Sequence, residues 1–336
     1  MPTPLLEVKD LSVHFPTADG LVKAVDGVSF SILPGETLGV VGESGSGKSV
    51  SFLTVMGLID RKAAKVEGEI IFQGQDLLKL PKDELRAIRG DKIGMIFQDP
   101  MTSLHPFYKI GDQIAEAVLA HKDVSKREAH ELAVELLRRV NIPKPVDRAN
   151  QYPHEFSGGM RQRAMIAMAL ALNPDLLIAD EPTTALDVTV QAQILDLIDR
   201  LKQEFNAAVV LITHDLGVVA EHCDQIQVMY AGRIMEQGTA EAIYYEPLNP
   251  YTWGLLQSIP RLDTEMDRLN PIRGAPPSLI QVPKGCPFHP RCPYAFDPCD
   301  KEIPPLLPVD GHHATACHLS LSDKVRIRNE NVMTRA

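Results

Sequence analysis

Hydrophobic and polar positions alternate through the first part of the chain. Residues 5–33 carry apolar side chains at alternate positions, in two runs that a polar turn at Asp19-Gly20 separates. Residues 69–73 and 92–97 also have the length and composition of strands. A period of two is that of a strand with one buried face. The alternation in residues 5–33 therefore predicts an antiparallel β layer near the N-terminus.

Near-continuous apolar runs predict a second kind of strand, buried on both faces. The runs lie at residues 37–41, 176–181 and 207–213. Such strands are typical of a parallel sheet that helices cover on both sides. From about residue 100 to 162 the apolar spacing is helical, and Ser125 with Glu128 forms a capping box. We therefore expect an α/β fold with an all-helical insertion.

A glycine-rich loop joins the first buried strand to a predicted helix at residues 50–58. The loop reads Gly42, Glu43, Ser44, Gly45, Ser46, Gly47, Lys48, Ser49. A chain wrapped around a triphosphate must present backbone N–H groups inward, and a helix N-terminus favours an anion. Lys48 would reach the β- and γ-phosphate oxygens, and the Ser49 hydroxyl would bind Mg²⁺. The alternative is a glycine-rich turn that holds no ligand.

Polar residues stand at the carboxyl ends of the predicted core strands, where α/β proteins place their chemistry. We expect Asp180 to hold Mg²⁺ through water and Glu181 to polarise an attacking water. Gln98 would offer its carbonyl oxygen to Mg²⁺ or to that water. His214 would lie beside the γ-phosphate. The alternatives are a solvated strand end for the carboxylates and a structural role for the histidine.

Two further features suit a nucleotide. Ser157-Gly158-Gly159 opens a second helix and predicts a second phosphate site, which would serve a nucleotide held by another subunit because it lies far from the first loop in sequence. Phe15 offers a ring on which adenine could stack. Its alternative is an inward-facing strand residue of the core.

Composition narrows the class of protein. The 336 residues have a net charge of -10, which argues against a broad nucleic-acid surface. No apolar run approaches the roughly 20 residues that span a bilayer. The first residues, Met1-Pro2-Thr3-Pro4, lack a basic segment followed by an apolar one. We therefore expect a protein that is neither secreted nor membrane-spanning by itself.

Four of the five cysteines, Cys286, Cys292, Cys299 and Cys317, lie in a proline-rich stretch that follows residue 246. Their spacing is too wide for a zinc ribbon, but four thiolates suit a [4Fe-4S] cluster. A zinc site remains open as an alternative because nearby histidines could add ligands, namely His289, His312, His313 and His318. Free or structural thiols are the third possibility. We expect the fifth, Cys223, to be a small buried apolar residue.

Together these features resemble the ATP-binding subunit of an ABC transporter, across roughly residues 5–245. The motifs that fall in the family's order are the loop from Gly42 to Ser49, Gln98, Ser157-Gly158-Gly159, Asp180-Glu181, Asp187 and His214. The resemblance implies a P-loop NTPase fold with a RecA-like mixed sheet over residues 1–245 and a small loop-rich appendage over residues 246–336. It also implies hydrolysis of ATP with Mg²⁺, with Asp187 in the ATP site and Lys48 and His214 stabilising charge on the γ-phosphate.

In that family two cassettes close face to face, so Ser157, Gly158 and Gly159 would act on ATP held by the partner. The family's usual glutamine after this turn is Met160 here. This departure removes a polar contact but no backbone donor, and we expect altered affinity without loss of the site.

A narrower resemblance is to the ATPase subunits of dipeptide and oligopeptide importers. It is carried by residues 98–104, by Asn249-Pro250-Tyr251-Thr252 and by residues 285–293. It implies a peripheral subunit on the cytoplasmic face of the plasma membrane, and it favours a [4Fe-4S] cluster at the four cysteines. The implied partners are a second, paralogous ATPase subunit, two membrane permeases and an extracytoplasmic binding protein. Nickel, glutathione or opine import and a non-transport ABC ATPase are the alternatives.

Overall fold

The computed structural model describes residues 3–184, 186–258 and 272–331, and these form two compact units. We call Met1–Thr3, Leu33–Glu36 and Lys79–Ile212 the helical unit. Pro4–Ile32, Thr37–Leu78 and Thr213–Ala336 make up the loop unit. The expected boundary near residue 245, between an ATP-binding domain and an appendage, stays a prediction.

The loop unit contains the predicted antiparallel layer. Its four strands run in the order β2-β1-β4-β5 and span Leu6–Thr17 (β1), Gly20–Ile32 (β2), Lys65–Phe72 (β4) and Gln75–Asp76 (β5). β1 pairs with both β2 and β4, and its buried residues alternate as Leu6 and Val8 and, after a register shift, as Leu11 and Val13. The alternating pattern therefore formed the sheet that it predicted.

A second set of strands in the loop unit carries the phosphate loop. In spatial order they are Leu307–Pro308 (β11), His313–Thr315 (β12), Arg233–Thr239 (β10), Gln225–Tyr230 (β9) and Thr37–Val41 (β3). β3 and β9 are parallel, whereas β9, β10, β12 and β11 pair antiparallel in turn. This part of the sheet is therefore mixed, as expected.

Helices complete the loop unit. They are Lys48–Val55 (α1), Leu216–His222 (α9), Ala240–Tyr245 (α10), Pro250–Gln257 (α11) and Leu321–Asn331 (α12), with a short 3₁₀ turn at His289–Arg291 (η2). α9 packs on β3. Cys223 follows α9 and lies close to Gly39 of β3, because a Cβ atom added to Gly39 would lie 2.9 Å from Cys223 Sγ. Cys223 is half-buried, which is less burial than we expected.

Three parallel strands form the core of the helical unit. They are Ile93–Ile96 (β6), Leu176–Asp180 (β7) and Ala208–Thr213 (β8), with β7 in the middle. Every residue of β6, β7 and β8 is buried, which explains why these runs are apolar without alternation. Their shared direction brings the residues after β6 and β7 to one edge.

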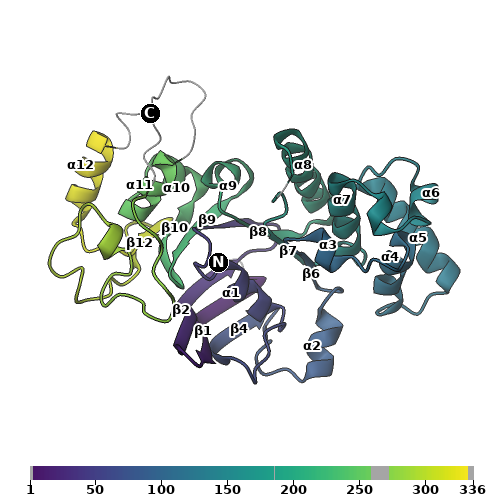
Figure 1. Ribbon diagram of the computed structural model, residues 1–336, viewed down its shortest axis with the longest axis horizontal. Helices are drawn as coiled ribbons and strands as arrows, with labels where there is room; N and C mark the ends of the chain where they lie inside the picture. Colours follow the sequence, from purple (N-terminus) through teal and green to yellow (C-terminus); the bar gives the residue numbers. More distant parts are fainter. Residues whose placement is uncertain (1–2, 185, 259–271, 332–336) are drawn as a thin grey trace. The chain divides into compact units, whose positions relative to one another are not determined.

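The predicted helical insertion is also present, and α4, α5 and α6 pack together (Figure 1). The helices of the unit are Lys82–Ile88 (α2), Pro100–Ser103 (α3), Ile110–Leu119 (α4), Lys126–Arg139 (α5), Pro145–Ala149 (α6), Gly158–Ala169 (α7) and Val188–Phe205 (α8), with a 3₁₀ turn at Pro153–Glu155 (η1). Ser125 and Glu128 form the predicted capping box at the start of α5. No helix in the described ranges is long and apolar enough to cross a membrane.

Candidate functional site

The phosphate loop connects β3 to α1, as the sequence predicts. Gly47 shows why glycine is needed, because its φ is +99° and a Cβ there would lie 2.2 Å from the carbonyl oxygen of Ala24. The Gly232 N–H donates to the carbonyl of Ser46 at 2.9 Å and fixes the loop from another side. Ser44 and Gly45 at the tip are exposed. The loop therefore has a fixed base and an open tip.

Lys48 begins α1 and folds over its own loop. The side chain is buried, and Nζ donates to the carbonyl oxygens of Gly42 at 2.7 Å and Glu43 at 3.1 Å. These bonds hold the ammonium group inside the curve of the loop. Ser49 follows in the first turn of α1 and is half-buried. The geometry suits a phosphate cradle, although the binding of ATP and Mg²⁺ by these residues stays a prediction.

In the helical unit, the structure brings two predicted residues together. Gln98 Nε2 donates to Glu181 Oε2 at 2.8 Å, and Thr184 Oγ1 donates to the same oxygen at 2.9 Å. The backbone of Glu181 is left-handed, with φ at +45°, which is uncommon for a residue other than glycine and is enriched at functional sites. Asp180 precedes it as the buried last residue of β7. A carboxylate held by two donors is well placed to orient a water molecule.

Thr184 is a residue that sequence reasoning missed. It stands three positions after Glu181, in a turn where the N–H of Thr184 donates to the carbonyl of Glu181. That spacing returns a side chain to the residue at the start of the turn. A polar residue three positions after the predicted carboxylate was the available signal.

Ser157 caps α7, and its Oγ accepts a hydrogen bond from the N–H of Met160 at 3.4 Å. Ser157 and Gly158 are exposed. The first N–H groups of a helix lack partners within that helix. The turn therefore has the expected form, and its action on a partner's nucleotide stays a prediction.

The remaining predicted residues lie at strand and helix ends. Asp187 caps α8, because its Oδ1 accepts from the N–H of Val190 at 3.0 Å. His214 is exposed between β8 and α9. Phe15 lies near the end of β1 and is half-buried, whereas Val13 on the same strand is fully buried. Half-burial leaves part of the ring of Phe15 accessible.

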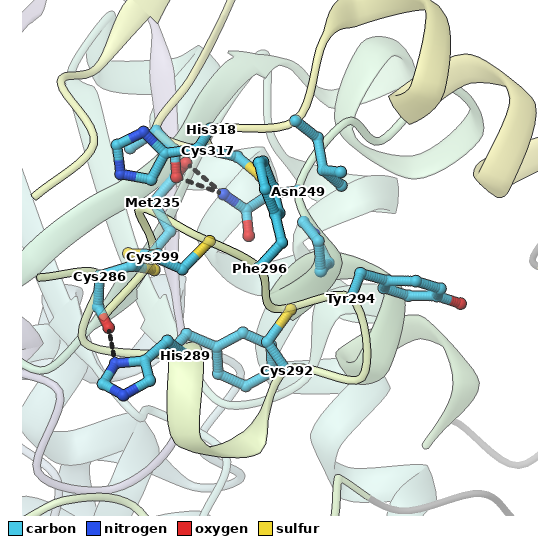
Figure 2. Close-up of a pocket in the computed structure, with 14 residues that line it drawn as sticks. Met235, Asn249, Cys286, His289, Cys292, Tyr294, Phe296, Cys299, Cys317 and His318 are labelled. Carbon is cyan, nitrogen blue, oxygen red and sulfur yellow. Dashed lines mark hydrogen bonds between the residues drawn. The ribbon is translucent and has the colours of Figure 1, made fainter. Parts of the chain in front are cut away.

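The four late cysteines line one cavity in the loop unit (Figure 2). Even so, within the described part of the chain, no three or more histidine, cysteine, aspartate or glutamate side chains are arranged to hold a metal ion. Burial raises the pKa of Cys286 to about 11 and that of Cys292 to about 12. Because the described residues offer no such arrangement, the prediction of a [4Fe-4S] cluster is wrong.

The zinc alternative has no support either, because the same lack of a ligand group within the described residues applies to zinc. Three of the nearby histidines contact other groups. His289 Nδ1 lies 2.9 Å from the carbonyl oxygen of Cys286, and Figure 2 marks this contact with a dashed line. His313 Nε2 contacts the buried carboxylate of Glu236 at 2.8 Å, and His318 Nε2 contacts the carbonyl of Glu302 at 2.9 Å. The cysteine count suggested ligation, but the local packing does not provide it.

Comparison with known proteins places these features in one family. The sequence profile of ABC transporters matches residues 25–184, and the profile of the oligopeptide/dipeptide transporter C-terminal region matches residues 235–299. The oligopeptide transport ATP-binding protein OppD of Haemophilus influenzae is 56% identical over 309 residues, which is 92% of this chain and 95% of that protein. The dipeptide transport ATP-binding protein DppD of Bacillus subtilis is 52% identical over 316 residues, 94% of each chain.

Solved structures agree with the sequence comparison. A dimeric post-hydrolysis structure of the ATP-binding cassette MJ0796, bound to ADP and Pi, has a TM-score of 0.63 and 30% identity, covering 70% of this chain and 98% of that one. The cbiO1 structure from Clostridium perfringens, part of the ABC transporter complex cbiONQ, has a TM-score of 0.61 and 27% identity, covering 72% and 91%. The chain therefore belongs to the ABC transporter family of ATP-binding proteins, with the fold of an ABC ATPase.

Proposed function

We propose that this chain is the ATP-hydrolysing subunit of an importer of dipeptides and oligopeptides. The observation that carries the hydrolytic role is the Glu181 carboxylate, which Gln98 and Thr184 hold at the end of a buried strand. The names of the relatives that match more than nine-tenths of the chain support peptides as the cargo. They favour peptides over nickel, glutathione, opines or a role outside transport.

We assign the ATP contacts residue by residue. Residues Gly42 to Ser49 bind the phosphates, Lys48 neutralises charge on the β- and γ-phosphates, and Phe15 stacks on adenine. Ser49, Gln98 and Asp180 hold Mg²⁺, directly or through water. The oxygen set of hydroxyl, amide and carboxylate suits this hard ion. Bound Mg²⁺ would neutralise charge on the phosphate oxygens.

Hydrolysis transfers the γ-phosphoryl group to water. Glu181 accepts a hydrogen bond from the attacking water and orients it, while His214 donates to the γ-phosphate oxygens. The bond between the γ-phosphorus and the bridging oxygen breaks, and ADP and inorganic phosphate leave. Gln98 senses the γ-phosphate because its amide group contacts the water or the metal when the γ-phosphate is present and can swing away when it is absent.

The proposed transport cycle needs a second cassette, which we expect to be a paralogue. Ser157, Gly158 and Gly159 of each chain contact the γ-phosphate held by the other, and Asp187 lies at that junction. Closure on ATP and reopening after hydrolysis would drive two permease subunits, with cargo delivered by an extracytoplasmic binding protein.

The chain would then be peripheral on the cytoplasmic face of the membrane, with an ATP-binding domain over residues 1–245 and an appendage over residues 246–336. The C-terminal region profile supports this assignment.

Uptake by the assembled complex tests the proposal. The chain is co-purified with its native membrane partners, reconstituted in vesicles with the binding protein, and supplied with ATP and a radiolabelled dipeptide or oligopeptide. We expect ATP-dependent peptide uptake that Lys48→Ala abolishes and that unlabelled peptide inhibits. Uptake of nickel or glutathione without uptake of peptide would contradict the proposed cargo.

A further inference from the structure

Glu43, the second residue of the phosphate loop, is bonded to a distant part of the chain. Its backbone N–H donates to Tyr251 Oη at 2.9 Å. Its carboxylate accepts hydrogen bonds from both Nη atoms of the Arg291 guanidinium, with Nη1 2.5 Å from Oε2 and Nη2 3.0 Å from Oε1. Arg291 lies 248 positions further along the chain, beside the cysteine cavity. We call these bonds from Tyr251 and Arg291 to Glu43 the loop clamp.

The guanidinium of Arg291 has little freedom to move. Its side chain is only 6% exposed. Nε donates to the carbonyl of Arg273 at 3.0 Å, and Nη2 donates to the carbonyl of Gly274 at 3.1 Å. Nη1 also contacts the hydroxyl of Tyr230 at 3.2 Å. Because these hydrogen bonds fix the planar guanidinium of Arg291, it holds the Glu43 carboxylate in one orientation.

The aromatic residues behind the clamp are packed as a rigid support. Tyr251 and Tyr230 are buried, and their rings lie 4.6 Å apart between centroids. Phe288 contacts both rings, at 5.2 Å from Tyr251 and 5.4 Å from Tyr230. Burial raises the pKa of the Tyr251 hydroxyl far above its usual value, so the group stays neutral. The acceptor for the Glu43 N–H is therefore constant over the physiological pH range.

The clamp also bears on the lysine of the loop. We call the chain after residue 246, which carries Tyr251 and Arg291, the C-terminal segment. The carbonyl oxygen of Glu43 accepts a hydrogen bond from Lys48 Nζ, so the residue that this segment holds is itself bonded to the phosphate-binding ammonium. If Glu43 shifts, the loop and one of the Lys48 partners shift with it. A cradle that is already in shape binds its ligand without the entropic cost of ordering.

We propose that Arg291 and Tyr251 are positioning residues for ATP binding, through which the C-terminal segment holds the phosphate loop in its binding conformation. Neither residue touches the nucleotide in this proposal. Loss of the clamp should weaken ATP binding and leave the rate of the bound complex nearly unchanged, because Glu181 is not involved. The inference rests on the proposed function, since it requires that this loop binds ATP.

The test compares ATP affinity in the full chain, measured with a fluorescent ATP analogue in EDTA so that hydrolysis does not interfere. Arg291→Ala should raise the Kd about tenfold, because a bond to a charged group is lost. Arg291→Lys keeps the charge but not the two-armed geometry, and it should lie between Arg291→Ala and the unchanged chain. Arg326→Ala is the matched control, because it removes an exposed arginine of the same segment that pairs with Asp323. Its Kd should not change.

A double-mutant cycle separates positioning from general stability. If the clamp acts through Glu43, Arg291→Ala combined with Glu43→Gln should raise the Kd no further than Arg291→Ala alone. Steady-state hydrolysis by Arg291→Ala should show a raised KM with kcat within about twofold, as loss of binding alone predicts. Effects that multiply in the double variant, or a Kd for Arg291→Ala within twofold of the unchanged chain, would overturn the proposal.

A second variant keeps the test decisive if Arg291→Ala does not fold. Tyr251→Phe retains the ring and removes only the hydroxyl, and it should raise the Kd about fivefold with little change in melting temperature. An unchanged Kd in this folded variant would also overturn the role of Tyr251. If the unchanged chain itself fails to bind ATP, the proposed function fails and the clamp has no role. If the unchanged chain binds ATP and neither variant differs from it, only the positioning role fails.

Discussion

Gln98 and Glu181 are hydrogen-bonded in the helical unit, with Gln98 Nε2 2.8 Å from Glu181 Oε2. They follow different strands, β6 and β7, whose parallel pairing brings their carboxyl ends together. The amide of Gln98 therefore occupies one side of the carboxylate that we assign to water activation. This bond gives the Glu181 side chain a defined orientation. In the proposed mechanism, Gln98 also contacts Mg²⁺ or the attacking water.

The bond from Thr184 to Glu181 should support turnover. Thr184→Val keeps the shape of the side chain but removes the donor to Glu181 Oε2. We expect kcat for ATP hydrolysis to fall about fivefold with little change in KM, because an exposed hydrogen bond to a charge contributes about 1 kcal/mol. Thr184→Ser retains the hydroxyl and should retain turnover. A Thr184→Val variant as active as the unchanged chain would exclude this supporting role.

The conformation of Gly47 should make alanine intolerable there. Gly47→Ala combines a left-handed φ of +99° with a Cβ 2.2 Å from the Ala24 carbonyl oxygen. We expect the free energy of unfolding to drop by about 3 kcal/mol and ATP binding to be lost. Gly27→Ala is the control, because its φ is +76° but the space around the added Cβ is open, so only about 1 kcal/mol should be lost. Chemical denaturation checks both values, and equal losses would show that the contact with Ala24 is unimportant.

Alkylation of the buried cysteines should depend steeply on pH. Burial raises the pKa of Cys286 to about 11 and that of Cys292 to about 12. At pH 8 their thiolate fractions, and hence their rates with iodoacetamide, should be at least about a hundredfold below those of an ordinary thiol. The rates should rise about tenfold per pH unit up to pH 11. Mass spectrometry of quenched samples measures them, with the urea-unfolded chain as the control.

The same thiols link stability to pH. Their folded-state pKa values lie above the unfolded-state value of about 8.5, so the folded chain holds these protons more tightly. The resulting stability is complete below about pH 8.5 and is lost as the pH rises toward 11 and 12. Fast alkylation of Cys286 and Cys292 at pH 8, or stability that increases above pH 9, would contradict the assigned burial effect.

Local patterns predicted much of the fold. The alternation in residues 5–33 became β1 and β2, and the loop from Gly42 to Ser49 lies between a buried strand and a helix, as its glycines indicated. Ser125 and Glu128 formed their capping box. Each of these features depends on residues that are close together in sequence, so periodicity and spacing contain the necessary information.

Features that depend on tertiary packing could not be predicted in this way. The pairing of Glu43 with Arg291 joins residues 248 positions apart, and no local pattern specifies such a contact. The four late cysteines indicated a metal site by their number, but number alone does not reveal their spatial arrangement, and the described residues form no group of metal ligands. Thr184 is intermediate, since its turn is local but the orientation of Glu181 is set by the pairing of β6 and β7.

A single-turnover experiment with γ-labelled ATP and the Glu181→Gln variant tests the central claim most directly. The variant is assembled with its native partners, loaded with ATP and Mg²⁺, and assayed both for bound nucleotide and for released phosphate. We predict that ATP remains bound and intact and that the two cassettes stay associated, because the orienting carboxylate is gone while the phosphate loop is unchanged. Phosphate release at the rate of the unchanged chain would contradict the account.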